Sequence, residues 1–220
     1  MKRRSYLTGV GGVLSIGLAD RPRFGSNATD STDPQSEPDE SATSRGSPAT
    51  AALRNPSFEE YLTGWTVGTD LPAAADDPTV PVDHAVSVTS ERASDGMNSL
   101  RLYIEGIADD GTIWVEQPVN FTGVQEVTVD VYSHQQSFNR MSQVAFFAGT
   151  KPRDGLSERD FNREHDIEDH SGWKTYTYSV SDLTGVATLA VGMNVVWETD
   201  IRRFFDNVRL VDERSTRDGS

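Results

Sequence analysis

Aromatic and hydrogen-bonding side chains alternate with apolar residues along several segments of this chain. Aromatic rings offer flat apolar faces, and amide or imidazole groups beside them can hydrogen-bond hydroxyls, which is the chemistry that recognition of a sugar ring requires. The candidate ligand-binding residues are Tyr103, Trp114, Tyr132, His134, Gln143, Asn194 and Trp197. If their strands share one sheet face, they form a cleft with an aromatic floor. If a second sheet covers that face, half of them belong to the core, and Trp197 has the parity of buried positions such as Val195.

Alternation with a period of two recurs between residues 99 and 211 and predicts the elements that position these residues. It is found in residues 99–106, 126–134, 173–180, 187–197 and 202–211. Leu100, Leu102 and Ile104 are expected on one side of the first of these segments, and Val127, Val129 and Val131 on one side of the second. Turn-forming clusters separate the segments, and only residues 155–169 could form a helical turn or two. The pattern predicts an all-β fold, a β-sandwich.

Five motifs, in this order along the chain, resemble one known family. They are Asn55-Pro56-Ser57-Phe58-Glu59 followed by Gly64-Trp65, then "ASDGMNSLRLYI", "VEQPVNFTG", "GWKTYTYSV" and "FFDNVRLV". Together they resemble carbohydrate-binding modules of the cellulose- and xylan-binding jelly-roll type. The resemblance implies a galactose-binding-like jelly-roll β-sandwich and a polysaccharide or glycan as the partner. We expect residues 55–66 to be the first strand, with Phe58 and Trp65 packed inward.

The same resemblance implies a structural calcium ion. It maps Glu59 and Asp206 as carboxylate ligands, with backbone carbonyls of residues 95–98 completing the shell, a set of oxygens that suits calcium. Such an ion would fasten the ends of a domain that contains no cysteine. The alternative is that Glu59 caps a turn and Asp206 forms local hydrogen bonds.

The chain divides into four parts by composition. Residues 1–19 carry paired arginines, a short apolar run and a small-residue cleavage site, and they resemble a twin-arginine signal peptide. The alternative is a basic, disordered start of a cytosolic protein. Residues 20–52 form an acidic Ser/Thr/Pro linker, 53–212 the folded domain and 213–220 a polar tail. We therefore expect a secreted or cell-surface protein, exported by the twin-arginine pathway and not inserted in the membrane after signal removal.

A net charge of −14 and a mean hydropathy of −0.51 restrict the partners. A surplus of carboxylates repels nucleic acid and anionic lipid, so neither is expected as a ligand. Abundant Asp and Glu beside only three lysines indicate a halophilic source, because concentrated salt screens the repulsion between carboxylates. We expect a monomer, and the sequons at Asn27 and Asn120 are possible glycosylation sites.

The segment between Gly149 and Gly172 is longer than the resemblance predicts and is rich in acidic residues. His165 and His170 lie among these carboxylates, but their spacing matches no established zinc pattern, and a solvated loop is the simpler interpretation. A long loop at one end of a sandwich can also carry binding specificity.

The function predicted from these observations is that of a non-catalytic carbohydrate-binding module. Jelly-roll sandwiches also occur as glycan-degrading enzymes that use paired carboxylates or a His/Tyr base. This chain contains no nucleophile motif, phosphate loop or metal motif, so we do not expect an enzyme, although a glycan-degrading one remains an alternative. A structural or adhesive surface domain without a sugar site is the other alternative.

Overall fold

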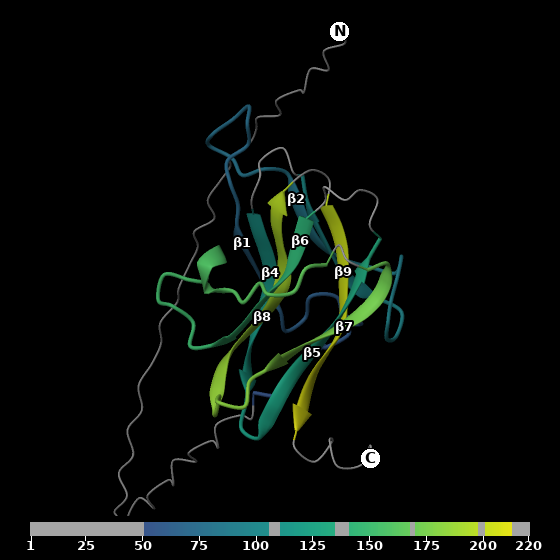
Figure 1. Ribbon diagram of the computed structural model, residues 1–220, viewed down its shortest axis with the longest axis vertical. Coiled ribbons are helices and arrows are strands. Elements are labelled where there is room, and N and C mark those ends of the chain that lie inside the picture. Colours follow the sequence, from purple (N-terminus) through teal and green to yellow (C-terminus); the bar gives the residue numbers. More distant parts are fainter. Residues whose placement is uncertain (1–50, 106–110, 135–140, 168–169, 198–200, 213–220) are drawn as a thin grey trace, which may run out of the picture. The chain divides into compact units, whose positions relative to one another are not determined.

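The computed structural model describes residues 51–105, 111–134, 141–167, 170–197 and 201–212, and these form two antiparallel β-sheets (Figure 1). The predicted segments 1–19 and 213–220, and residues 20–50 of the predicted linker, lie outside this description. The elements, in chain order, are β1 Thr66–Asp70, β2 His84–Thr89, β3 Ser99–Ile104, β4 Gly111–Asn120, β5 Val124–Ser133, β6 Met141–Gly149, the 3-10 helix η1 Glu158–Asp160, β7 Gly172–Ser179, β8 Val186–Trp197 and β9 Ile201–Asp212. Among the described residues, no helix has the length and apolar character needed to cross a membrane.

The two sheets have the orders β1-β4-β8-β6 and β2-β3-β9-β5-β7. All the pairings within them are antiparallel, and neighbours in a sheet are mostly distant in sequence. One hydrophobic core lies between the sheets and draws residues from both. The predicted all-β sandwich is thus confirmed.

Alternation correctly predicts which side chains enter this core. Leu100, Leu102 and Ile104 of β3 are fully buried, as are the three predicted valines of β5. Successive side chains of a strand point to opposite faces, so the residues between them lie on the outer face of the five-stranded sheet. The predicted helical turn within residues 155–169 is also present, as η1.

The opening segment is a run of turns and not the predicted first strand. Hydrogen bonds from the Phe58 amide to the Asn55 carbonyl, and from the Tyr61 amide to the Phe58 carbonyl, close successive turns. The Asn55 side chain organises them, since its Nδ2 donates to the Tyr61 carbonyl and its Oδ1 accepts from the Glu60 amide. Phe58 and Trp65 are nevertheless buried as predicted and stack with ring centroids 5.5 Å apart.

A row of small residues crosses the outer face of the four-stranded sheet on both sides of Trp114. Gly68 of β1 and Gly192 of β8 are both in register with Trp114 of β4, and Ala145 of β6 is in register with Gly192. The indole lies over Gly68, where an added Cβ would fall less than 3.0 Å from the ring. Gly68 therefore makes room for the indole ring, and Gly192 allows the main chain of β4 to approach β8 closely.

Candidate functional site

Six of the seven predicted ligand-binding residues lie on two opposite outer faces of the sandwich. Tyr103 and Tyr132 are on β3 and β5 of the five-stranded sheet, and His134 directly follows β5. Trp114, Gln143 and Asn194 are on β4, β6 and β8 of the four-stranded sheet. The backbone of Trp197 belongs to β8, but its side chain lies outside the described part of the structure. The predicted set therefore cannot form a single cleft.

The outer face of the four-stranded sheet is covered by residues 150–167, which we call the strap. Leu156 and Phe161 of the strap pack over Trp114, and the Phe161 and Trp114 ring centroids are 5.0 Å apart. Trp114 is consequently only 3% exposed. Its Nε1 donates to the Glu116 carboxylate at 3.1 Å, and Lys151 of the strap forms an ion pair with the same carboxylate. The ring is thus part of a small second core in this structure.

Main-chain hydrogen bonds fix the strap along the edge of β6. The Val144 amide donates to the His165 carbonyl, and Phe146 exchanges two hydrogen bonds with Asn162. Gln143 donates from Nε2 to Asp166 Oδ1 at 3.0 Å. The strap therefore extends the sheet edge and is held in one place, as a binding site requires.

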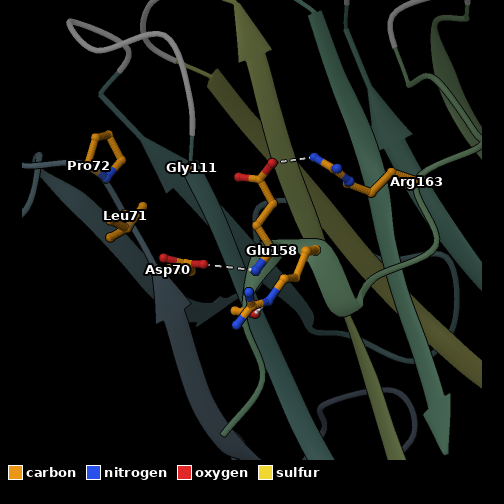
Figure 2. A pocket seen from close by; sticks show the side chains of 8 residues that line it. Asp70, Leu71, Pro72, Gly111, Glu158 and Arg163 are labelled. Atoms are coloured by element: carbon orange, nitrogen blue, oxygen red, sulfur yellow. Dashed lines mark hydrogen bonds and ion pairs between the residues drawn. The ribbon is translucent and has the colours of Figure 1, made fainter. Parts of the chain in front are cut away.

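An open cleft remains where the strap meets the ends of β1 and β4 (Figure 2). Its volume is about 520 Å³, which is within the range of small-molecule sites, about 300–1,000 Å³. Leu71, Pro72 and Gly111 form an apolar wall, and the polar lining consists of Asp70, Ser157, Glu158, Arg159 and Arg163.

The polar lining is organised by η1 and the residue before it. Ser157 caps η1, and its amide and Oγ both donate to Asp160 Oδ2, which lowers the pKa of Asp160. The Glu158 amide donates to Asp70 Oδ2 at 2.9 Å, so η1 is attached to the end of β1. This places the Glu158 side chain in the cleft.

Charges of both signs meet inside the cleft. The Arg163 guanidinium forms an ion pair with Glu158, as the dashed line in Figure 2 shows. The Arg163 and Glu158 side chains are 33% and 23% exposed, so both remain accessible to a ligand. Arg163 Nη1 also lies 3.5 Å from Asn194 Oδ1. A pair of this kind offers donors and acceptors side by side.

Asn194 is a predicted ligand residue that lies beneath this pair and is fully buried. Its Nδ2 donates to Thr112 Oγ1 at 2.9 Å and contacts the Gly111 carbonyl at 3.3 Å. Its Oδ1 is directed to Arg163. In this structure Asn194 thus supports Arg163 from below.

On the opposite outer face, the predicted tyrosines are half-buried and lie close to arginines. The Arg92 guanidinium carbon lies 4.3 Å from the centre of the Tyr132 ring, and that of Arg202 lies 5.6 Å from the centre of the Tyr103 ring. Trp173 of β7 contacts the Tyr132 ring edge to face. His134 is exposed.

Glu59 and Asp206, the predicted calcium ligands, both hold the turn of residues 94–98. Glu59 Oε1 accepts hydrogen bonds from the Met97 and Asn98 amides at 2.8 Å. Asp206 Oδ2 accepts from the amides of Ser94 and Asp95, and its Oδ1 accepts from the amide of Asn207. Burial raises the pKa of Asp206, although these hydrogen bonds act to lower it.

These contacts do not fit a calcium ion held between the two carboxylates. A cation needs oxygen ligands, and the resemblance implied carbonyls from this turn. The turn instead directs N–H groups at both carboxylates. The arrangement corresponds to the alternative of local hydrogen bonds, and we call it the carboxylate clasp. The calcium ion remains a prediction.

The two histidines of the long segment lie beside tyrosines. His165 is half-buried, with its ring centroid 5.5 Å from that of Tyr176 and 5.2 Å from that of Tyr178. His170 lies 5.8 Å from Tyr176. In the described residues, no group of three or more His, Asp or Glu side chains is placed to hold a metal ion.

Sequence reasoning missed Asp70, Glu158 and Arg163 as cleft residues. One local signal was available, since Ser157 followed three residues later by Asp160 is the pattern of a capped turn. It predicts that a turn begins at Ser157. It contains no information that the turn lies against β1, because Asp70 and Glu158 are 88 residues apart.

Comparisons with known proteins do not assign this chain to a family. No protein-family profile matches the chain, and no curated protein sequence matches it. Among similar solved structures, a family 61 carbohydrate-binding module in complex with β-1,4-galactotriose is 18% identical, with a TM-score of 0.47, over 74% of this chain and 99% of the other. The CBM22-1 xylan-binding domain of Paenibacillus barcinonensis Xyn10C is 20% identical, with a TM-score of 0.41, over 71% and 92%.

The K1 cleaved adhesin domain of Lys-gingipain from Porphyromonas gingivalis is also similar. It is 12% identical, with a TM-score of 0.49, over 71% of this chain and 96% of the other. Several of the similar structures are thus carbohydrate-binding modules with a β-sandwich fold. At these identities and TM-scores, they carry no argument about the ligand of this chain.

Proposed function

We propose that this domain is an exported, non-catalytic carbohydrate-binding module that holds a glycan in the cleft between the strap and the ends of β1 and β4. The observation that supports the proposal most directly is the lining of this cleft. A charged pair, Glu158 and Arg163, faces an apolar wall that contains Leu71 and Pro72. A sugar ring presents hydroxyls at its edge and C–H groups on its faces, and this lining is complementary to both.

The chemistry of the pair suits vicinal hydroxyls. Two adjacent hydroxyls can donate to the Glu158 carboxylate and accept from the Arg163 guanidinium, whose donors lie in a fixed plane. Both residues belong to the strap, which is attached to β1 through Asp70 and to β6 through main-chain hydrogen bonds, so little ordering of the protein is needed on binding. An apolar wall of Leu71 and Pro72 would then cover one face of the ring.

Replacing Arg163 is expected to reduce glycan affinity. In Arg163→Ala, dissociation constants for any soluble glycan bound by the wild type should rise about tenfold or more, because a charged hydrogen-bond donor of the cleft is lost. Arg163→Lys should bind glycans more tightly than Arg163→Ala but less tightly than the wild type, because lysine keeps the positive charge but lacks the planar set of donors. Affinity electrophoresis against a panel of neutral glycans, followed by calorimetry on those that retard the protein, measures both.

Arg153→Ala is the matched control, because Arg153 is an exposed arginine of the same strap and does not line the cleft. It makes the same change in net charge and should bind like the wild type. Unchanged melting temperatures would show that the variants are folded. Equal affinities of Arg153→Ala and Arg163→Ala would place the glycan elsewhere, and no retardation on any glycan would contradict the proposal.

The alternative of a structural or adhesive domain is favoured by one observation. The strap buries Trp114, the largest candidate aromatic of its face, beneath Leu156 and Phe161. An enzyme is the remaining alternative, since Asp70 and Glu158 are two carboxylates in one cleft. Incubation with each retained glycan and a reducing-end assay separates the proposals: release of new reducing ends would contradict a non-catalytic module.

A further inference from the structure

Three arginines gather around Phe204 on the outer face of the five-stranded sheet. Arg101 of β3 is in register with Phe204 of β9, and Arg202 lies two residues before it on the same face. The guanidinium carbon of Arg92 lies 5.7 Å from the centre of the Phe204 ring. We call Arg92, Arg101 and Arg202 the arginine cluster. Such a concentration of positive charge is unexpected in a chain with a net charge of −14.

Two arginines of the cluster stack on aromatic rings, and the third forms a single side-chain hydrogen bond. Arg92 lies over Tyr132 and Arg202 over Tyr103, while Arg101 Nε donates to Ser87 Oγ at 3.2 Å. A guanidinium stacked on a ring keeps its N–H donors in its own plane, pointing away from the ring. Arg202 is exposed, and Arg92 and Arg101 are half-buried. The cluster therefore holds donors in fixed planes that can still bind an acceptor.

Little negative charge compensates the cluster within the described residues. Glu91 lies 3.8 Å from Arg92, and both side chains are well exposed, so this pair is weak. No described carboxylate forms an ion pair with Arg101 or Arg202. The two aspartates further along the face, Asp130 and Asp206, are engaged by other donors: Asp130 accepts from Thr175, Ser94 and Asn207, and Asp206 belongs to the carboxylate clasp.

We infer that the arginine cluster binds the carboxylate or sulfate groups of an anionic polysaccharide. Guanidinium groups bind both anions through two parallel hydrogen bonds. The Tyr103 and Tyr132 rings hold the guanidinium groups in place, and the half-buried Trp173 ring beside Tyr132 supplies an apolar surface for a sugar ring. The inference rests on the proposed function in taking the ligand to be a glycan, but it concerns a second site on the opposite face of the sandwich.

The charge of the whole chain does not oppose this ligand as it opposes nucleic acid. Salt screens carboxylates that lie more than about 8–10 Å away, so the local arginines dominate at close range. A polyuronate also carries its charges farther apart than duplex DNA, which has one per about 1.7 Å of axis. A ligand with fewer, spaced charges and sugar rings is therefore the better match.

The test uses the full chain and four polymers in about 0.15 M NaCl. Polygalacturonic acid offers carboxylates and dextran sulfate offers sulfates, while neutral dextran and single-stranded DNA are the comparison polymers. Affinity electrophoresis and biolayer interferometry should show binding to one or both acidic polysaccharides and weaker binding to dextran and DNA. The two acidic arms identify which anion is bound.

The decisive variant is Arg101→Gln/Arg202→Gln, which leaves Arg92 and its packing in place. It should weaken binding to the acidic polysaccharide by about tenfold or more, with an unchanged melting temperature. Arg153→Gln/Arg209→Gln, which removes two exposed arginines outside the cluster, is the matched control and should bind like the wild type.

The cleft variant Arg163→Ala separates this inference from the proposed function. It should lose neutral glycans and keep the acidic polysaccharide, so either site can fail by itself. Three results would overturn the inference: no binding to either polyanion, equal loss in the cluster and control variants, or tighter binding of DNA than of both acidic polysaccharides.

Discussion

A Gly192→Ala variant is expected to lose about 4 kcal/mol of unfolding free energy, more than most single substitutions cause. An added Cβ at this position would fall less than 3.0 Å from the Ile113 carbonyl and from Trp114 Cα of the adjacent β4. Both obstacles are main-chain atoms, so relief requires β4 and β8 to separate. In a folded domain of this size, the melting temperature should fall by roughly 8–16 °C.

Chemical denaturation and thermal melting measure this loss, and Gly149→Ala is the matched control. Gly149 lies on β6 of the same sheet, and an added Cβ there would meet only the Phe147 ring at ordinary contact distance. That variant should remain within about 0.5 kcal/mol of the wild type. A Gly192→Ala protein as stable as Gly149→Ala would show that the row around Trp114 does not limit how closely β4 and β8 approach.

The Gly192→Ala substitution should also weaken ligand binding in the proposed cleft. Phe161 of the strap packs on Trp114, and the same strap carries Ser157, Glu158 and Arg163 to the cleft. If β4 and β8 separate, the support for this segment changes. Gly192→Ala should therefore bind neutral glycans less well at temperatures where it is still folded, whereas Gly149→Ala should bind them like the wild type.

An Asp206→Ala variant should lose about 3 kcal/mol, the second large effect. The Asp206 side chain is fully buried and accepts hydrogen bonds from the amides of Ser94, Asp95 and Asn207. Its removal leaves these amides without their acceptor, and the buried Asn207 amide in particular becomes an unsatisfied donor, which costs about 1–3 kcal/mol. The desolvation that raises the pKa of Asp206 is relieved at the same time, which limits the loss.

Asp212→Ala provides the control, because Asp212 is an exposed aspartate at the end of the same strand. Its stability should change by less than about 0.5 kcal/mol. Melting the wild type with and without a chelator then tests the calcium prediction directly. If the carboxylate clasp works through N–H donors, the chelator should leave the melting temperature unchanged. A fall of several degrees would mean that a cation is bound and that the turn rearranges around it.

The two proposed binding sites lie on opposite faces of the sandwich and differ in the ligand groups they would bind. The cleft at the end of the four-stranded sheet holds a charged pair beside an apolar wall, and the face of the five-stranded sheet holds the arginine cluster beside three aromatic rings. A polysaccharide that engages both faces would give two binding events per domain. The cleft and cluster variants together measure each contribution.

The alternation of the chain was sufficient to predict a β-sandwich and much of its core. Leu100, Leu102 and Ile104 are buried because neighbouring side chains in any strand point to opposite sides, whichever strand pairs with it. Phe58 and Trp65 were assigned correctly to the interior, although their segment forms turns organised by Asn55. Burial of large aromatic rings depends on hydrophobicity more than on the local backbone form.

The candidate site required the folded chain. Tyr103 and Trp114 look equivalent along the sequence, yet β3 and β4 belong to different sheets, so the two residues face opposite ways out of the sandwich. Trp114 is then covered by Phe161, a residue of a segment that has no strand pattern. The cleft joins Asp70, Gly111 and Arg163, which are far apart in the chain. Local periodicity reports which side of a strand is apolar, whereas sheet partners and strap position depend on contacts between distant segments.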